Sequence, residues 1–155
     1  MSKSYMEEYQ RWLDSPALSE AEWQELKSIE NDEKEIEGRF FEPLTFGTAG
    51  LRGIMGVGLH RMNVHVIRHA TQAFANVIKA EGPEACEKGI AIAYDCRVNS
   101  ELFAREAAGV MAANGIRVRI TNGMRPTPEL SFAVIHYGTT AGLNITASHN
   151  PKEYN

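Results

Sequence analysis

The stretch GIAIAY, at residues 89–94, decides the fold class of this chain. It is a short, continuous apolar run, which is typical of a strand buried on both faces of a parallel sheet. Two similar runs follow, IRVRIT at 116–121 and AGLNIT at 141–146, and helical segments are predicted over 100–114 and 127–137. This alternation predicts a three-layer α/β/α domain with a mostly parallel sheet and helices on both faces.

Capping signals set the expected helix ends. Ser100 is the expected N-cap of the first helix, and Gly115 lies just past its end. In the second helix Pro128 follows Thr127 at the start, and Gly138 closes it. A further helix is expected to begin after Asn63 and to end at Gly82-Pro83, with a buried face made of Val66, Ile67, Ala70, Phe74, Val77 and Ile78.

The first 42 residues have a different texture, and they are predicted to form a helical extension. Helices are expected over 4–14 and 19–38, the second opened by a capping box of Ser19 and Glu22 and stopped near Gly38. Apolar positions are sparse there, which indicates a peripheral, solvated arm. We therefore divide the chain into this extension, 1–42, and an α/β domain, 43–155.

Charge and composition exclude several classes of protein. Residues 1–42 carry twelve acidic and five basic side chains, a net of −7, whereas residues 43–155 carry eight and eleven, a net of +3. A mildly basic body suits an anionic ligand, but without a Lys/Arg run a nucleic-acid partner is not expected. No membrane span or signal peptide is expected either, and two cysteines without a CxxC spacing suit a cytoplasmic location.

In open α/β sheets, ligands bind beyond the carboxyl ends of the strands. Three segments are expected at this rim: 95–97, 122–127 and 146–150. A glycine-rich loop, FGTAGLRG at 46–53, could also hold a phosphate on its backbone N–H groups beside Arg52, although the loop taken alone favours a plain glycine-rich turn.

The residues alone leave Ser148 and the metal question open. Asn150-Pro151 favours a turn after the last strand, and in extended backbone the neighbouring side chains of Ser148 and His149 would point apart. His65 and His69 share a helix face without a third ligand nearby. From residue 43 onward Asp95 is the one aspartate, so no carboxylate cluster suited to Mg²⁺ is expected.

Four segments, in the same order, resemble the α-D-phosphohexomutase family, which includes phosphoglucomutases and phosphomannomutases. They are FGTAGLRG at 46–53, YDCRVNS at 94–100, RPTPELSFAV at 125–134 and ITASHNPKEYN at 145–155. The resemblance covers about residues 40–155, and the serine segment is its most specific part. It is greatest to the bacterial phosphoglucomutase branch and implies a first domain, with domains II–IV absent and the chain truncated at Asn155.

The resemblance implies a phosphoserine enzyme. Ser148 would pass its phosphate to a hexose monophosphate, giving a bisphosphate, and glucose 1-phosphate and glucose 6-phosphate would interconvert. Catalytic roles would fall to Ser148, His149 and Arg52. The sugar phosphate would be bound by Gly50, Arg52, Arg125, Thr127 and Asn150.

The implied cofactors are Mg²⁺ and, as activator, glucose 1,6-bisphosphate. In this chain Mg²⁺ would bind only the phosphate on Ser148, because the family's carboxylate ligands lie in its second domain. The isolated fragment is therefore expected to be inactive. Phosphopentomutase or phosphomannomutase activity, or a non-catalytic phosphosugar-binding module, remain as alternatives.

Overall fold

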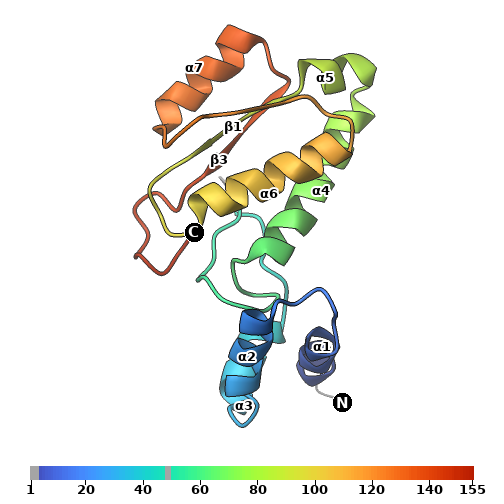
Figure 1. Ribbon diagram of the computed structural model, residues 1–155, viewed down its shortest axis with the longest axis vertical. Helices are drawn as coiled ribbons and strands as arrows, with labels where there is room; N and C mark the ends of the chain where they lie inside the picture. The colour runs from blue at the N-terminus through green and yellow to red at the C-terminus, as the bar shows by residue number, and fades with distance from the viewer. Residues whose placement is uncertain (1–3, 48–49) are drawn as a thin grey trace. The chain divides into compact units, whose positions relative to one another are not determined.

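A computed structural model describes residues 4–47 and 50–155 (Figure 1). It contains two compact units, one comprising residues 1–63 with Tyr154 and the other residues 64–153 with Asn155. The elements in chain order are α1 (Ser4–Leu13), α2 (Glu20–Ser28), α3 (Glu33–Phe40), α4 (Val64–Ala80), α5 (Pro83–Lys88), β1 (Ile90–Tyr94), α6 (Ser100–Ala113), β2 (Val118–Ile120), α7 (Thr127–Tyr137) and β3 (Ala141–Ile145). The domain division proposed at residues 42/43 differs from that of the compact units and stays a prediction.

A parallel sheet with the order β2-β1-β3 forms the centre of the second unit. Ile90 of β1 is in register with Val118 on one side and with Ala141 on the other. All five residues of β1 are buried, as its continuous apolar run predicts for a central strand. The expected parallel α/β architecture is confirmed.

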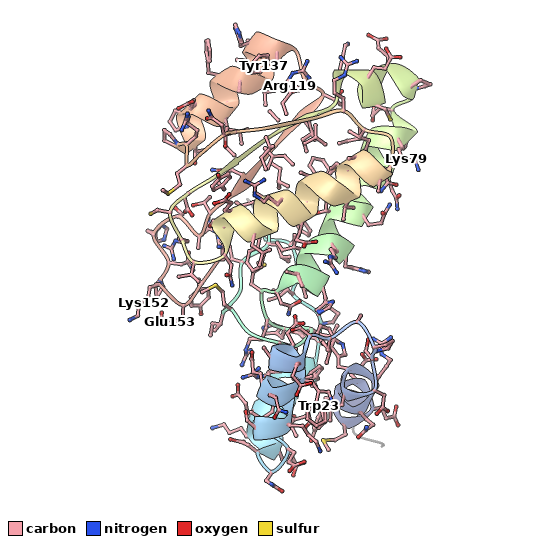
Figure 2. The ribbon with its side chains drawn as sticks, in the orientation of Figure 1. Trp23, Lys79, Arg119, Tyr137, Lys152 and Glu153 are labelled. Atoms are coloured by element: carbon pink, nitrogen blue, oxygen red, sulfur yellow. The ribbon has the colours of Figure 1, made fainter. Side chains whose placement is uncertain are left out.

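Helices cover both faces of this sheet (Figure 1). Helix α7 packs on β1 and β3, where Leu130 joins the small side chains of Ala91 and Ala93 in one buried cluster. Helix α6 covers the opposite face and contacts all three strands, and α4 packs against α6. Arg119 of β2 also reaches the ring of Tyr137 at the end of α7, with its guanidinium carbon 5.3 Å from the ring centroid (Figure 2).

Several predicted helix details in this unit are corrected. Asn99, not Ser100, is the N-cap of α6, because the Ser100 hydroxyl is bonded elsewhere. Val77, expected in the core, is 58% exposed on α4, where Ile67, Thr71, Ala75 and Ile78 make the buried face. Pro83 does not merely end α4 but begins the short helix α5, which suits a proline at the first helical position. The end of α7 at Gly138 is confirmed.

The helical extension has a buried core of its own, so its interpretation as a solvated arm is wrong. The predicted helix over 19–38 is two helices, because the Asp32 carboxylate accepts from the Glu35 amide and starts α3. Helix α3 also continues past Gly38 to Phe40. The Ser19–Glu22 capping box is confirmed. The core consists of Tyr5, Tyr9, Leu26, Ile36, Phe40 and Val57.

An ion network joins α2 and α3 in this first unit. Arg39 is paired with Glu25 of α2 and with Glu35 on its own helix, and it also donates to the carbonyl of Val57 (3.0 Å). The hydrogen bond from Arg39 lowers the pKa of the Glu35 carboxyl, against an opposing effect of burial.

Within residues 4–47 and 50–155, no helix has both the length and the apolar character that a membrane span requires.

Gly89 gives a direct stability prediction. Its φ is +73°, and a Cβ there would lie 1.9 Å from the carbonyl oxygen of Arg117. Gly89→Ala should therefore lower the free energy of unfolding by more than about 2 kcal/mol in urea titrations. Gly109→Ala is the matched control, because nothing lies within 4 Å of that position on α6. Alanine there should be neutral or should stabilise by up to about 1 kcal/mol. Equal effects of the two changes would contradict the role of Gly89.

Candidate functional site

Ser148 lies in the turn that follows β3, and its side chain is exposed. Its φ of +53° is in the left-handed region, which residues other than glycine rarely adopt. Because of this geometry Ser148 Oγ lies 3.4 Å from His149 Nδ1, at the long limit of a hydrogen bond. The expectation that the two side chains point apart is wrong, since it assumed extended backbone.

Asp95, directly after β1, holds the ends of two strands and the start of α6 together. Its Oδ1 accepts from the Arg97 amide (2.9 Å) and the Ser100 hydroxyl (2.7 Å), and its Oδ2 accepts from the Thr146 hydroxyl (2.6 Å). Burial alone would raise the pKa of this carboxyl. The hydrogen bonds from Thr146, Arg97 and Ser100, together with the Arg97 charge, outweigh that effect and lower the pKa below its ordinary value.

The backbone of Ser148 is bonded on both sides. Its N–H donates to Thr146 Oγ1 (3.1 Å), which in turn donates to Asp95. Its carbonyl accepts from Arg97 Nη2 (2.9 Å). The same guanidinium donates to the carbonyls of Asn150 (2.6 Å) and Pro151 (2.8 Å). The Arg97 side chain is only 16% exposed, so the serine turn closes around it.

The far end of this loop returns to the same group of residues. Asn155 is 3% exposed, and its side-chain amide donates to Ser100 Oγ (2.9 Å) and to the carbonyl of Val98 (3.1 Å). Between the two anchored ends, Lys152 and Glu153 are exposed at the outer edge of the loop (Figure 2). Residues 146–155 are therefore tied at one end to Asp95 itself, through Thr146, and at the other end to Ser100, which also bonds Asp95.

The rim segment at 122–127 joins the same sheet edge through its backbone. The amide of Arg125 donates to the carbonyl of Tyr94, the last residue of β1 (2.9 Å). The Arg125 guanidinium itself contacts neighbouring groups, namely the side chains of Asn122 and Glu129 and the carbonyl of Met124. Thr127 Oγ1 accepts from the side-chain amide of Asn144 (2.6 Å) and can still donate its own hydrogen.

The glycine-rich loop belongs to the first unit. Thr48 and Ala49 lie outside the described residues, so the predicted phosphate nest can be described only in part. The Gly47 amide donates to the carbonyl of Gly50 (2.9 Å), and Gly50 has a φ of +131°. Arg52 follows with an exposed side chain. The phosphate-binding roles of Gly50 and Arg52 stay predictions.

The described part of the chain, 4–47 and 50–155, contains no group of three or more His, Cys, Asp and Glu side chains arranged to hold a metal. His65 and His69 lie four residues apart on α4. Asp95, the carboxylate nearest in sequence to the rim, already accepts three hydrogen bonds. These residues do not fit a complete Mg²⁺ site, and a metal bound through a phosphate on Ser148 stays a prediction.

Sequence reasoning placed Asp95 and Arg97 at the rim but did not include either among the site residues. A signal was present in YDCR, since an aspartate directly after a buried strand, two residues before an arginine, can bond that arginine's amide and orient its side chain. The contacts of Arg97 with carbonyls more than fifty residues away, in contrast, depend on the tertiary fold.

Replacement of Asp95 should change the acid sensitivity of the fold. Because its folded pKa is lowered, the carboxylate stabilises the fold above its unfolded pKa of about 3.9, and the stabilisation is lost as pH falls through the folded pKa. Asp95→Asn should cost about 1–3 kcal/mol of unfolding free energy at pH 7 and should flatten the loss of stability below about pH 4. Urea titrations between pH 3 and 7 measure both effects. Glu153→Gln, on the exposed part of the loop, is the control, and an unchanged acid slope in Asp95→Asn would contradict the prediction.

Residues 43–155 match the family model described as phosphoglucomutase/phosphomannomutase, alpha/beta/alpha domain I. The chain is 38% identical to a Staphylococcus saprophyticus phosphoglucomutase (93% of this chain, 25% of the relative) and 42% identical to the Staphylococcus aureus phosphoglucomutase (84% and 23%). It is 39% identical to a human phosphopentomutase (81% and 22%). A crystal structure of a phosphomannomutase candidate from Thermus thermophilus superposes with a TM-score of 0.65 at 33% identity, covering 72% of this chain and 24% of that one.

The chain thus spans about a quarter of the length of its relatives. With the family model matched along the whole α/β region and relatives at this identity, the chain belongs to the α-D-phosphohexomutase family of phosphoglucomutases and phosphomannomutases.

Proposed function

We propose that Ser148 is the phosphoryl carrier of a phosphoglucomutase-type enzyme, an intramolecular phosphotransferase that interconverts glucose 1-phosphate and glucose 6-phosphate. One observation carries the proposal, the left-handed Ser148 turn, which exposes the hydroxyl at the rim of the sheet while both backbone groups of the serine are bonded. Since the chain spans about a quarter of the length of its relatives, the proposal assigns the rest of the catalytic cleft to a longer polypeptide, and we expect the fragment alone to be inactive.

The chemistry is two phosphoryl transfers. A free hydroxyl of the hexose monophosphate attacks the phosphorus of the phosphoserine, and the bond from phosphorus to Ser148 Oγ breaks as the bond to the sugar oxygen forms. The proton of the attacking hydroxyl is lost, and the serine oxygen gains one. His149 Nδ1 lies 3.4 Å from Ser148 Oγ, which supports a role in exchanging that proton. The bisphosphate then reorients in the site so that its other phosphate faces Ser148. That phosphate returns to the serine by the same steps in reverse.

The negative charge of two phosphates requires cations and oriented donors. A phosphoserine and a phosphosugar each bring up to two negative charges at neutral pH. We assign Arg52 to the transferring phosphoryl group and Gly50, Asn150, Thr127 and Arg125 to binding of the sugar phosphate. The Thr127 hydroxyl has a hydrogen to donate, which supports its assignment. The Arg125 guanidinium would have to exchange a bond to Asn122 or Glu129 for one to the substrate.

Two further groups belong to the proposal. Mg²⁺ would neutralise charge on the phosphoserine, with protein ligands supplied outside this chain. Glucose 1,6-bisphosphate would act as activator, because it can donate one phosphate to an unphosphorylated Ser148 and leave as a monophosphate.

Peptide mass spectrometry on the full-length protein, purified without phosphatase, tests the proposal. We expect a phosphate on Ser148. Trypsin does not cut between Arg125 and Pro126, so the peptide runs from residue 120 to 152 and also contains Ser131. Fragment ions must therefore localise the phosphate.

Ser148→Ala should remove the phosphate and should lower turnover by a factor on the order of 10⁶, as for loss of a nucleophile. The control Ser131→Ala should change neither the phosphate nor the turnover. Absence of phosphate on Ser148, even after incubation with glucose 1,6-bisphosphate and Mg²⁺, would favour a non-catalytic phosphosugar-binding module.

Arg52 should matter for transfer rather than for folding, because its side chain is exposed. Arg52→Ala in the full-length enzyme should lower kcat/KM by about 10²–10³-fold, the usual effect of removing a donor from a developing anion. The melting temperature should stay unchanged. Arg11→Ala is the control, since Arg11 is an exposed arginine of the same unit that pairs only locally with Glu8. An unfolded Arg52→Ala protein would show that the residue is structural.

A pentose phosphate is the strongest alternative substrate. The human relative, 39% identical over 81% of this chain, carries the name phosphopentomutase, and the Thermus structure is that of a phosphomannomutase candidate. All of these reactions use the same phosphoserine step, so Ser148 does not discriminate between them. The ratios of kcat/KM for glucose 1-phosphate, ribose 1-phosphate and mannose 1-phosphate on the full-length enzyme decide the substrate.

A further inference from the structure

Arg97 forms an ion pair with Asp95, and its guanidinium also donates to three backbone carbonyls of the serine turn. We propose that Arg97 is a positioning residue for Ser148, and that its planar guanidinium, rather than its charge alone, holds the turn in the conformation that presents the serine hydroxyl. The catalytic consequence rests on the proposed function of Ser148, whereas the effect on the turn does not.

The contacts themselves carry the inference. Two nitrogens of the guanidinium donate to three backbone carbonyls, those of Ser148 (2.9 Å), Asn150 (2.6 Å) and Pro151 (2.8 Å). All three acceptors are neutral carbonyl oxygens on the loop that Ser148 begins. A fork of donors with fixed angles matches such a set of acceptors, whereas the ammonium of a lysine is a single compact centre on a flexible stem.

Asp95 contacts both the backbone and the side chain of Arg97. The Arg97 amide donates to Asp95 Oδ1 (2.9 Å), and its Nε lies 3.9 Å from Asp95 Oδ2. The side chain is only 16% exposed. Because backbone and side chain are both oriented by one carboxylate, Arg97 has little freedom to follow the loop, and the loop must conform to it.

Ser148 needs such support because of its backbone. The left-handed region costs a residue with a Cβ roughly 1–2 kcal/mol, so a free turn would leave it. The Thr146 hydroxyl holds the N–H of Ser148, and Arg97 holds its carbonyl. Removal of Arg97 releases the carbonyl side, and the direction of the Cα–Cβ bond that carries the hydroxyl then becomes variable.

The effect on chemistry would come through geometry. Phosphoryl transfer needs the donor and acceptor oxygens in line, and a displacement of about 1 Å at a reacting group can cost about 100-fold in rate. Arg97 would therefore act on kcat for phosphoryl transfer, with little effect on KM for the sugar phosphate.

The test compares Arg97→Met, Arg97→Lys and the control Arg105→Met in the full-length protein. Arg105 is an exposed arginine on α6 that pairs with Glu101, four residues before it on the same helix. Three quantities are measured: the single-turnover rate of phosphate transfer from glucose 1,6-bisphosphate to dephosphorylated Ser148, KM for glucose 1-phosphate, and hydrogen exchange of the Ser148 and Asn150 amides. The Ile92 and Ala93 amides of the buried strand β1 serve as internal reference.

We expect Arg97→Met to slow transfer by about 100-fold and Arg97→Lys by at least about 10-fold, with KM unchanged. The Ser148 and Asn150 amides should exchange faster in both variants, the β1 amides should keep their protection, and Arg105→Met should match the wild type. Full rate and protection in Arg97→Lys would show that charge suffices and overturn the proposal. Loss of β1 protection in Arg97→Met would overturn it in favour of a general structural role. If wild-type Ser148 takes no phosphate, the proposed function fails, and amide exchange alone still decides whether Arg97 holds the turn.

Discussion

The carboxylate of Asp95 is the interaction on which the arrangement of the site depends. It follows the central strand β1, where the carboxyl ends of parallel strands meet at one edge. Its two oxygens accept hydrogen bonds from the amide of Arg97, from the hydroxyl of Ser100 at the start of α6, and from the hydroxyl of Thr146 directly after β3. The turn after β1 and the start of α6 are therefore held to the same group as the end of β3, 51 residues further along the chain, and each of them loses a partner if that group changes.

Thr146 shows how this arrangement reaches the serine. A hydroxyl has one hydrogen to donate and can also accept. Thr146 donates its hydrogen to Asp95, so its oxygen accepts the Ser148 amide. Arg97 makes the matching contact on the other side of Ser148, through its carbonyl. The unusual backbone of Ser148 is thus produced by its neighbours, and the local sequence Ala-Ser-His-Asn does not by itself dictate it.

The parts of the fold that follow from local patterns were predictable, and those that depend on tertiary contacts were not. The three apolar runs predicted the three parallel strands, and Gly138 and the Ser19 capping box predicted helix ends, because each signal acts within a few residues. Ser100 was wrongly predicted as the cap because its oxygen accepts from the distant side chain of Asn155, while its hydrogen is donated to Asp95. The closeness of Ser148 and His149 was missed because a left-handed serine cannot be recognised without the distant side chains that hold it.

The arrangement around Asp95 also bears on the proposed phosphoryl transfer. Asp95 is the one aspartate from residue 43 onward. A carboxylate that already accepts three hydrogen bonds has little capacity left for a cation, and removing those bonds to bind one would release both Ser100 and Thr146. Its charge is better understood as orienting Arg97 and the serine turn. If Ser148 carries the phosphate as proposed, Asp95 would serve to hold that serine in a fixed conformation, and it could not also bind a divalent cation without disturbing the serine turn.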